Sequence, residues 1–167
     1  AIFSALKNKD PKKFAGTIEF YPEEGKYHLD GHRKCGVCME PEETIKNHML
    51  CTVCGSPVTV GVLHRVNELA DRKSSDPPPR PYPFESLVGL ATILGEIFQV
   101  SADSKKVEAE YFHLLKTLGP ELAILRKLSL AELTTYSALL AEGIRRVRSG
   151  ELHIEAGYDG EFGTIHL

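Results

Sequence analysis

The four cysteines of the chain fall in one short stretch and have the spacing of a metal site. They form the pattern C-x2-C-x12-C-x2-C and are Cys35, Cys38, Cys51 and Cys54. Two C-x2-C pairs can supply the four thiolates that a tetrahedral zinc ion prefers. Because protein ligands fill all four positions, such a site is structural rather than catalytic. Two disulfides or an iron–sulfur cluster are the alternatives, and the absence of a secretory segment disfavours disulfides.

A second polar group, H-x-D-x-H, precedes the first cysteine pair. It consists of His28, Asp30 and His32. On an extended strand these side chains share one face, where imidazole and carboxylate can bind a metal or act as acid and base. Gly31 favours a turn, which would break this face. Metal binding, contact with a phosphate and support of the adjacent cysteine pair therefore stay open.

Other candidate residues carry weaker patterns. His48 lies between the two cysteine pairs and could compete as a ligand, whereas His64 and Arg65 come after the pairs and could contact a phosphate. The chain contains no G-x-x-x-x-G-K-[ST], G-x-S-x-G or H-E-x-x-H motif, so nucleotide hydrolysis, serine hydrolysis and zinc proteolysis through these motifs are excluded.

The elements around the cysteines are expected to be short. Strands are predicted over residues 16–20 and 58–60, and a helix is predicted over 62–70 with a shared face of Val62, Val66 and Leu69. Five prolines lie within residues 72–83, which excludes a helix or a central strand there. We therefore expect a semi-rigid linker over 73–84 between two modules.

The part of the chain after the prolines has helical periodicity. Apolar stripes predict helices within 87–98, 107–118, 122–128 and 139–147, the second opened by Asp103. A further helix is predicted to start at Ser129-Leu130, before the last one. Ser129 and Glu132 have capping-box spacing, and Gly150 is placed to end the last helix. The final residues alternate around Asp159-Gly160, which predicts a β-hairpin. The expected fold class is α+β, with a zinc ribbon joined by a Pro-rich linker to a helical domain of about four to five helices.

Composition limits the classes of partner. The 167 residues are 42% hydrophobic and 26% charged, which fits a globular chain rather than a disordered one. The net charge of −3 gives no overall attraction to nucleic acid, so phosphate binding would depend on local basic clusters such as Lys7–Lys13, His32–Lys34 and Arg145–Arg148. No apolar stretch could span a membrane and no signal segment opens the chain, so a cytoplasmic location without membrane contact is expected.

Three segments resemble the endonuclease Q family of PHP-domain proteins, a group often labelled UvrD-type helicase or helicase-related protein. Residues 17–35 read TIEFYPEEGKYHLDGHRKC and resemble the segment that leaves the PHP domain of that family. Residues 60–72 read VGVLHRVNELADR and resemble the segment after its zinc ribbon, and residues 141–163 resemble its C-terminus. The resemblance covers nearly the whole chain.

The resemblance implies a DNA-repair endonuclease that nicks DNA 5′ of deaminated bases such as uracil and hypoxanthine. The family's catalytic metals belong to its PHP domain, whose His- and Asp-rich motifs do not precede Thr17 here. The resemblance therefore implies a tail of that domain over 1–32, a zinc ribbon with its following helix over 33–72, and a helical domain over 85–167. On this interpretation the chain has no catalytic residue of its own, and its partners are DNA and the missing N-terminal catalytic domain.

We expect DNA contacts from basic side chains near the ribbon and from exposed aromatic rings. The candidates for phosphate contact are His28, His32, Arg33, Lys34, His64 and Arg65. Tyr27 and Tyr82 could stack on an unpaired base, such as one extruded for repair. The segment from Leu130 to Arg148 also resembles a helix-hairpin-helix, although Thr134–Ser137 replaces the usual glycines.

Two other classes of function are compatible with the same residues. One is a protein-interaction adaptor or a helicase-associated accessory domain, because zinc ribbons often bind proteins. The other is a free-standing metallohydrolase that uses His28, Asp30 and His32. Metal analysis distinguishes the metallohydrolase from the other classes, because it needs a second, labile metal beside the tightly held zinc.

Overall fold

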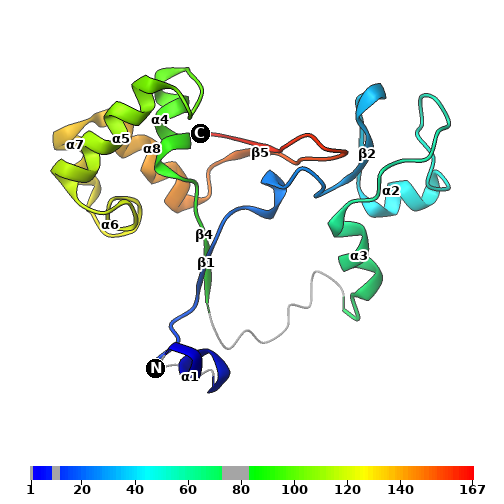
Figure 1. Cartoon of the computed structure of the whole chain (residues 1–167), viewed down its shortest axis with the longest axis horizontal. Helices are drawn as coiled ribbons and strands as arrows, with labels where there is room; N and C mark the ends of the chain where they lie inside the picture. The colour runs from blue at the N-terminus through cyan, green and yellow to red at the C-terminus, as the bar shows by residue number, and fades with distance from the viewer. Residues whose placement is uncertain (1, 9–11, 73–82) are drawn as a thin grey trace. The chain divides into compact units, whose positions relative to one another are not determined.

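The structure is a computed structural model that describes residues 2–8, 12–72 and 83–167. The chain divides into two compact units (Figure 1). The first comprises Ala1–Ser86 with Glu155–Thr164, and the second comprises Leu87–Ile154 with Ile165–Leu167. Short helices and short strands make up both units, so the expected α+β class is confirmed. Most of the predicted linker, together with Tyr82, lies outside the described residues.

A small antiparallel hairpin is the centre of the first unit. Strand β2 (Asp30–His32) pairs with β3 (Val37–Met39), with Asp30 opposite Met39. The connection is a 3-10 turn, η2 (Arg33–Cys35), which ends at Gly36 in the left-handed conformation, with φ 63°. Such a φ is strained for residues with a Cβ, so glycine suits this tight connection.

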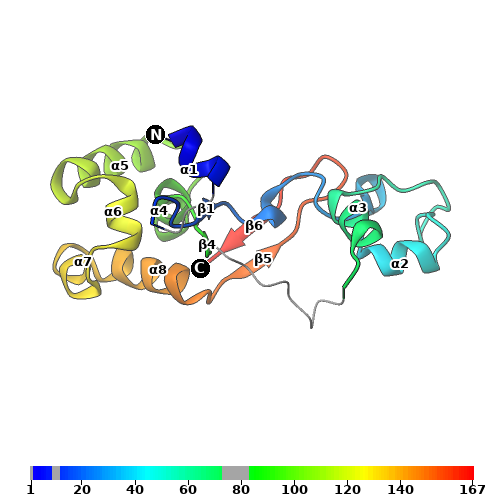
Figure 2. The same cartoon turned by 90° about the horizontal axis from the view of Figure 1, so that it is seen from below.

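Two helices and a small apolar core accompany this hairpin. Helices α2 (Pro41–Lys46) and α3 (Val62–Leu69) lie close to one another (Figure 2). The core consists of Val37, Met39, Cys51 and Val58. The strand expected over 58–60 is reduced to an isolated bridge between Thr59 and Gly31.

Helix α3 confirms the predicted helix but not a buried apolar face. Its apolar stripe faces solvent, with exposed fractions of 64% for Val62, 54% for Val66 and 67% for Leu69. The residue that this helix buries is His64, which is 5% exposed. Periodicity identifies which residues share a face, but burial depends on whether another element covers that face.

The remaining elements of the first unit include a parallel pair of strands. Helix α1 (Ile2–Asn8) is followed by β1 (Thr17–Glu19) and the 3-10 turn η1 (Pro22–Glu24). The predicted strand over 16–20 is thus confirmed by β1. It pairs in parallel with β4 (Phe84–Ser86), with Thr17 opposite Phe84 (Figure 1).

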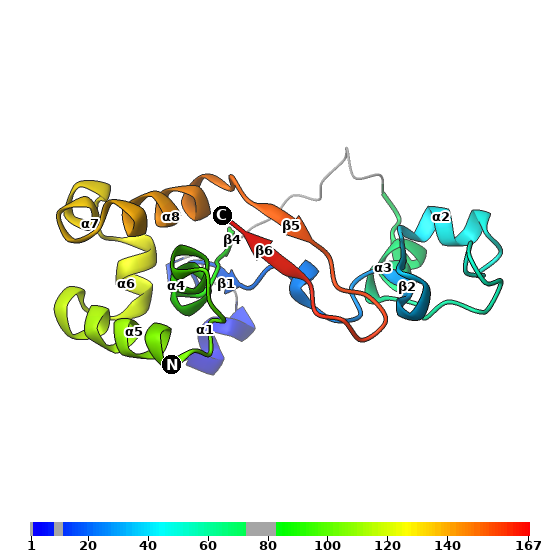
Figure 3. The ribbon, with the colours of Figure 1, turned by 90° about the horizontal axis from the view of Figure 1, so that it is seen from above.

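Five helices form the second unit, all of whose residues are described (Figures 2 and 3). They are α4 (Leu90–Phe98), α5 (Lys105–Leu118), α6 (Glu121–Arg126), α7 (Leu130–Tyr136) and α8 (Ala138–Ser149). Their fully buried apolar residues come from every one of these helices and include Leu90, Ile93, Leu114, Ile124, Leu133 and Ile144. None of the helices in the described ranges has the length and hydropathy needed to cross a bilayer.

Side chains at the helix ends explain where the helices begin. The Ser129 hydroxyl and the Glu132 carboxylate form the predicted capping box of α7. Helix α5 begins one residue later than expected, because Ser104 rather than Asp103 accepts the hydrogen bond from the third backbone N–H of the helix. Gly150 ends α8 with φ 70°, as predicted.

The expected hairpin between α7 and α8 is absent. Ser137 is both the last cap of α7 and the first cap of α8, so one residue joins the two helices. The hydroxyls of Thr134 and Thr135 donate to carbonyl oxygens of their own helix, those of Leu130 and Ala131. This connection leaves no loop of free amides to hold a DNA phosphate.

The chain ends in the predicted β-hairpin (Figure 3). Strands β5 (His153–Glu155) and β6 (Thr164–His166) pair with one another. Between them, Asp159 and Gly160 have φ values of 43° and 88°. Two successive positive φ values are those of the hairpin turn that Asp-Gly favours.

Candidate metal centre and its surroundings

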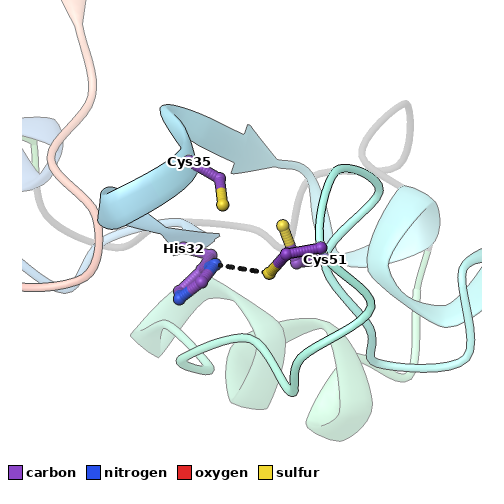
Figure 4. Close-up of side chains that lie close together, drawn as sticks. His32, Cys35 and Cys51 are labelled. Atoms are coloured by element: carbon purple, nitrogen blue, oxygen red, sulfur yellow. Dashed lines mark hydrogen bonds between the residues drawn. The ribbon is translucent and has the colours of Figure 1, made fainter.

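Three cysteines and one histidine bring their ligand atoms together beside the β2–β3 hairpin (Figure 4). The ligand atoms of His32, Cys35, Cys51 and Cys54 all lie within 4.8 Å of one another. Figure 4 labels the first three of these residues. Within this group, Nδ1 of His32 lies 3.4 Å from Sγ of Cys54. Tetrahedral zinc with ordinary Zn–S and Zn–N bonds spaces its ligand atoms roughly 3.5–3.8 Å apart. A small closing movement would therefore let these four residues hold a zinc ion.

Cys38 is not a member of this group, which differs from the four-cysteine set expected from spacing. It is the middle residue of β3, whose flanking residues Val37 and Met39 are buried while Cys38 is exposed. Side chains alternate along a strand, so the side chain of Cys38 lies on the opposite face of β3 from those of Val37 and Met39. His32, at the end of β2, brings the fourth ligand atom of the group instead. Metal binding was one of the roles that the sequence left open for His32.

A glycine follows each of the two residue pairs in this group. Gly36 follows Cys35 and Gly55 follows Cys54, so the two pairs read H-x2-C-G and C-x2-C-G. Both glycines have positive φ, 63° and 70°. The amide of Gly36 donates to the carbonyl of Arg33, and that of Gly55 donates to the carbonyl of Cys51. Each pair is thus a closed turn, whereas no glycine follows Cys38.

Local hydrogen bonds set unequal pKa values within the thiol group. The hydroxyl and backbone amide of Ser56 lower the pKa of Cys54 to about 6. Hydrogen bonding to Cys54 raises the pKa of Cys35 to about 11. One thiolate thus makes a second less favourable in this crowded group. A bound divalent cation would reverse that repulsion, because it favours the deprotonated form of every coordinating thiol.

The H-x-D-x-H residues do not form a joint site. Asp30 is fully buried, and its carboxylate accepts a hydrogen bond from the amide of Gly61 at 2.6 Å. Its other oxygen lies 2.6 Å from Nδ1 of His64. His32 instead faces the thiols, and His28 is outside the metal group found among the described residues. This separation removes the geometry on which the metallohydrolase alternative depended.

The residues expected to contact DNA have different environments. His64 is buried against Asp30 and has little surface to offer a phosphate. Arg65 is exposed, and its guanidinium donates to Glu68 at 2.6 Å. Arg33 and Lys34 are exposed on η2, and His28 is half-buried. His48, in the turn after α2, is also outside the metal group. Arg33 and Lys34 are therefore the candidates whose placement suits a phosphate best.

Asp159 fixes the C-terminal hairpin turn to the ribbon, a role that the sequence did not indicate beyond the turn itself. Its carboxylate accepts hydrogen bonds from the Thr59 hydroxyl at 2.5 Å and from the Arg33 amide at 2.7 Å. These bonds, that of Thr59 first, lower the pKa of Asp159. A Cβ on Gly31 would collide with the ring of Tyr158 and the carbonyl of Val37, so glycine permits this close packing.

Curated relatives match almost all of the chain. Residues 89–151 match the family model described as the MJ0043 C-terminal domain. The chain is 33% identical to the uncharacterized protein MJ0043 of Methanocaldococcus jannaschii, over 98% of this chain and 20% of that protein. It is 30% identical to the uncharacterized protein YqxK of Bacillus subtilis, over 96% of this chain and 38% of that protein.

Two solved structures are similar in both fold and sequence. The lesion-specific endonuclease PfuEndoQ from Pyrococcus furiosus has a TM-score of 0.77 and 27% identity, over 90% of this chain and 37% of that chain. An endonuclease Q in complex with a 27-mer duplex that carries an abasic lesion at the active site has a TM-score of 0.82 and 26% identity, over 99% of this chain and 42% of that chain.

These comparisons connect the chain with endonuclease Q, a lesion-specific endonuclease. None of these four relatives is named as a helicase, so the expected helicase connection is not supported. The chain spans between one fifth and about two fifths of the length of each relative. The matches therefore establish a structural relationship to part of endonuclease Q, over nearly the whole of this chain.

Proposed function

We propose that this chain is a DNA-holding part of a lesion-directed endonuclease whose catalytic metal centre lies in another part of the full-length protein. The observation that carries the proposal is the similarity over 99% of the chain to an endonuclease Q bound to duplex DNA. The relative is a DNA-bound nuclease, and this chain corresponds to 42% of its length.

The metal group supports a structural role for this chain. Three thiols and one imidazole supply four protein ligands, which leave no position for a water nucleophile. Structural zinc sites of this kind contribute directly to folding, and apparent binding free energies are about 10–16 kcal/mol for small zinc domains. We assign the zinc to holding the β2–β3 hairpin and the Cys51–Cys54 turn, and assign no step of DNA cleavage to it.

Salt-dependent DNA binding tests the proposal. The zinc-loaded chain is titrated into a fluorescent duplex that contains one abasic site, and the dissociation constant is measured from 50 to 200 mM salt. If about three phosphates are contacted, affinity should fall about 40-fold over this range. The chain alone should not nick the duplex when Mg²⁺ or Mn²⁺ is added. Absence of binding, or cleavage by the isolated chain, would refute the assignment.

Protein docking is a second candidate function, favoured by the exposed stripe of α3. Val62, Val66 and Leu69 are each more than half exposed and lie on one face of that helix. Exposed apolar faces of this kind often mark interaction sites. The salt titration separates the two candidates, because an apolar protein interface does not lose affinity steeply as salt rises.

A further inference from the structure

Two exposed aromatic rings flank one lysine on the unit that carries the metal group. Nζ of Lys26 lies 5.7 Å from the ring centroid of Tyr27 and 5.5 Å from that of Phe162. The exposed fractions are 45% for Tyr27 and 72% for Phe162. Two exposed rings around one cation offer π faces on which a flat ligand can stack.

Backbone hydrogen bonds join the two segments that carry these rings, residues 24–29 and 157–163. The amide of Gly160 donates to the carbonyl of Lys26 at 2.9 Å, and the amide of Leu29 donates to the carbonyl of Gly157 at 3.0 Å. A third bond joins the amide of Gly163 to the carbonyl of Glu24 at 3.1 Å. The two segments that carry the rings are thus joined by backbone hydrogen bonds of neighbouring residues, which reduces the entropy lost when a ligand binds.

Besides Lys26, one guanidinium lies near the turn that carries Gly160. A Cβ on Gly160 would come within 3.9 Å of Nη1 of Arg33, so this guanidinium lies next to the turn that precedes Phe162. Lys34 follows on η2 and is also exposed. An apolar protein surface would bury these cations at a cost, whereas a nucleotide offers a π face to the rings and a phosphate to the cations.

We propose that Lys26, Tyr27 and Phe162 form a stacking surface for an unpaired nucleotide of bound DNA, whose phosphate Arg33 contacts. This inference rests on the proposed function, because it requires that the chain binds DNA. Stacking of bases on aromatic side chains tolerates any sequence, since every base has a π face. The surface therefore recognises an unstacked base rather than a particular base.

A comparison of bulged and fully paired DNA tests the surface. Two duplexes of equal length carry 2-aminopurine, one within a two-nucleotide bulge and the other in a paired position. Affinity is measured by anisotropy, and stacking by quenching of 2-aminopurine fluorescence. The zinc-loaded chain should prefer the bulged duplex and quench its probe. Phe162→Ala should weaken binding to the bulge about 5- to 150-fold and abolish quenching.

Matched variants separate stacking from general loss of apolar surface. Tyr27→Phe should retain binding and quenching, whereas Tyr27→Ala should lose both. Phe112→Ala removes a ring that is 61% exposed on α5, in the other unit, and should change neither. Zinc content and thermal melting verify that each variant is folded.

The outcomes distinguish this inference from the proposed function. If the unmodified chain binds neither duplex, the proposed function is refuted together with the surface. If the chain binds DNA but Phe162→Ala leaves the preference for the bulge and the quenching unchanged, only the stacking surface is refuted. An equal loss of affinity for both duplexes, or the same loss in Phe112→Ala, also refutes it.

Discussion

Replacing His32 by Ala should weaken zinc binding strongly, whereas replacing Cys38 by Ser should leave it nearly unchanged. The two residues discriminate between the ligand set of the structure and the one expected from cysteine spacing alone. The ligand atom of His32 lies within 4.8 Å of the three grouped sulfurs, while Cys38 is exposed in the middle of β3. Neither change removes a residue of the small apolar core around Val37 and Met39.

The expected magnitude is set by the number of ligands. Structural zinc binding of about 10–16 kcal/mol, divided over four ligands, assigns about 2.5–4 kcal/mol to each. Loss of His32 should therefore lower zinc affinity about 70- to 900-fold. Because zinc binding contributes to folding of this unit, the same variant should also lower the midpoint of its thermal transition. Cys38→Ser should change the zinc affinity by less than about threefold, because only indirect effects on the unfolded chain, of a few tenths of a kcal/mol, are expected.

Competition with a chromophoric zinc chelator measures both affinities under reducing conditions. Cys54→Ser serves as a positive control, because both candidate ligand sets contain Cys54. If Cys38→Ser releases zinc as readily as Cys54→Ser and His32→Ala does not, the four-cysteine set is correct. Equal losses in both variants would show that the ligands exchange in solution, which would also refute a unique set with His32.

Three further predictions concern the two units separately. Asp30→Ala should destabilise the first unit by about 3–5 kcal/mol in denaturant titrations, because it leaves the Gly61 amide and the His64 ring without their buried acceptor. An unchanged free energy of unfolding would show that Asp30 does not stabilise this unit. Gly31→Ala should lower the melting temperature of that unit, because its Cβ would collide with the Val37 carbonyl and the Tyr158 ring. Gly89→Ala, in the second unit, has space and should leave the melting temperature of the second unit unchanged. An unchanged melting temperature in Gly31→Ala would contradict this packing. The pKa of Glu142 is lowered to about 2, first by hydrogen bonding to Arg145. The contribution of this pair to the stability of the second unit is therefore present above pH 4.5 and is lost as the pH falls toward 2. A titration midpoint of Glu142 near 4.5 in carboxyl NMR spectra would show that this pair does not form in solution.

Local sequence patterns predicted the features that depend on neighbours in the chain. The capping box at Ser129, the end of α8 at Gly150 and the turn at Asp159-Gly160 all agree with the structure. Each is determined by a few consecutive residues whose hydrogen bonds or φ values suit one conformation. The helical periods succeeded for the same reason, because side-chain spacing along a helix is fixed.

Features that depend on distant segments were not predictable from these patterns. The parallel pairing of β1 with β4 joins residues on either side of the proline-rich stretch. The exposed stripe of α3 has the same periodicity as a buried one, so its period could not reveal its burial. Asp30 and His64 pair across more than thirty residues, and neither position carries a pattern that identifies the other.

The metal ligands lie between these two cases. Spacing of the cysteines predicted a metal site and three of the residues that the structure groups, but it favoured Cys38 over His32. Glycine positions contain the missing information, since a glycine with positive φ closes each turn directly after its second ligand. In this chain the turn-closing glycines follow the two pairs of grouped residues, whereas the cysteine count alone does not identify the group.

One hydrogen bond, from a backbone amide next to His32, joins the metal group to the hairpin turn beside the proposed stacking surface. Arg33 immediately follows His32, and its amide donates to Asp159 in the turn that precedes Phe162. The same carboxylate accepts from Thr59, near the other end of the ribbon. A metal that orders the His32–Cys35 turn therefore also orders the donor that holds the C-terminal hairpin turn. If the proposed zinc site and the proposed DNA binding both hold, removal of the metal should therefore weaken DNA binding through the loss of this hydrogen bond.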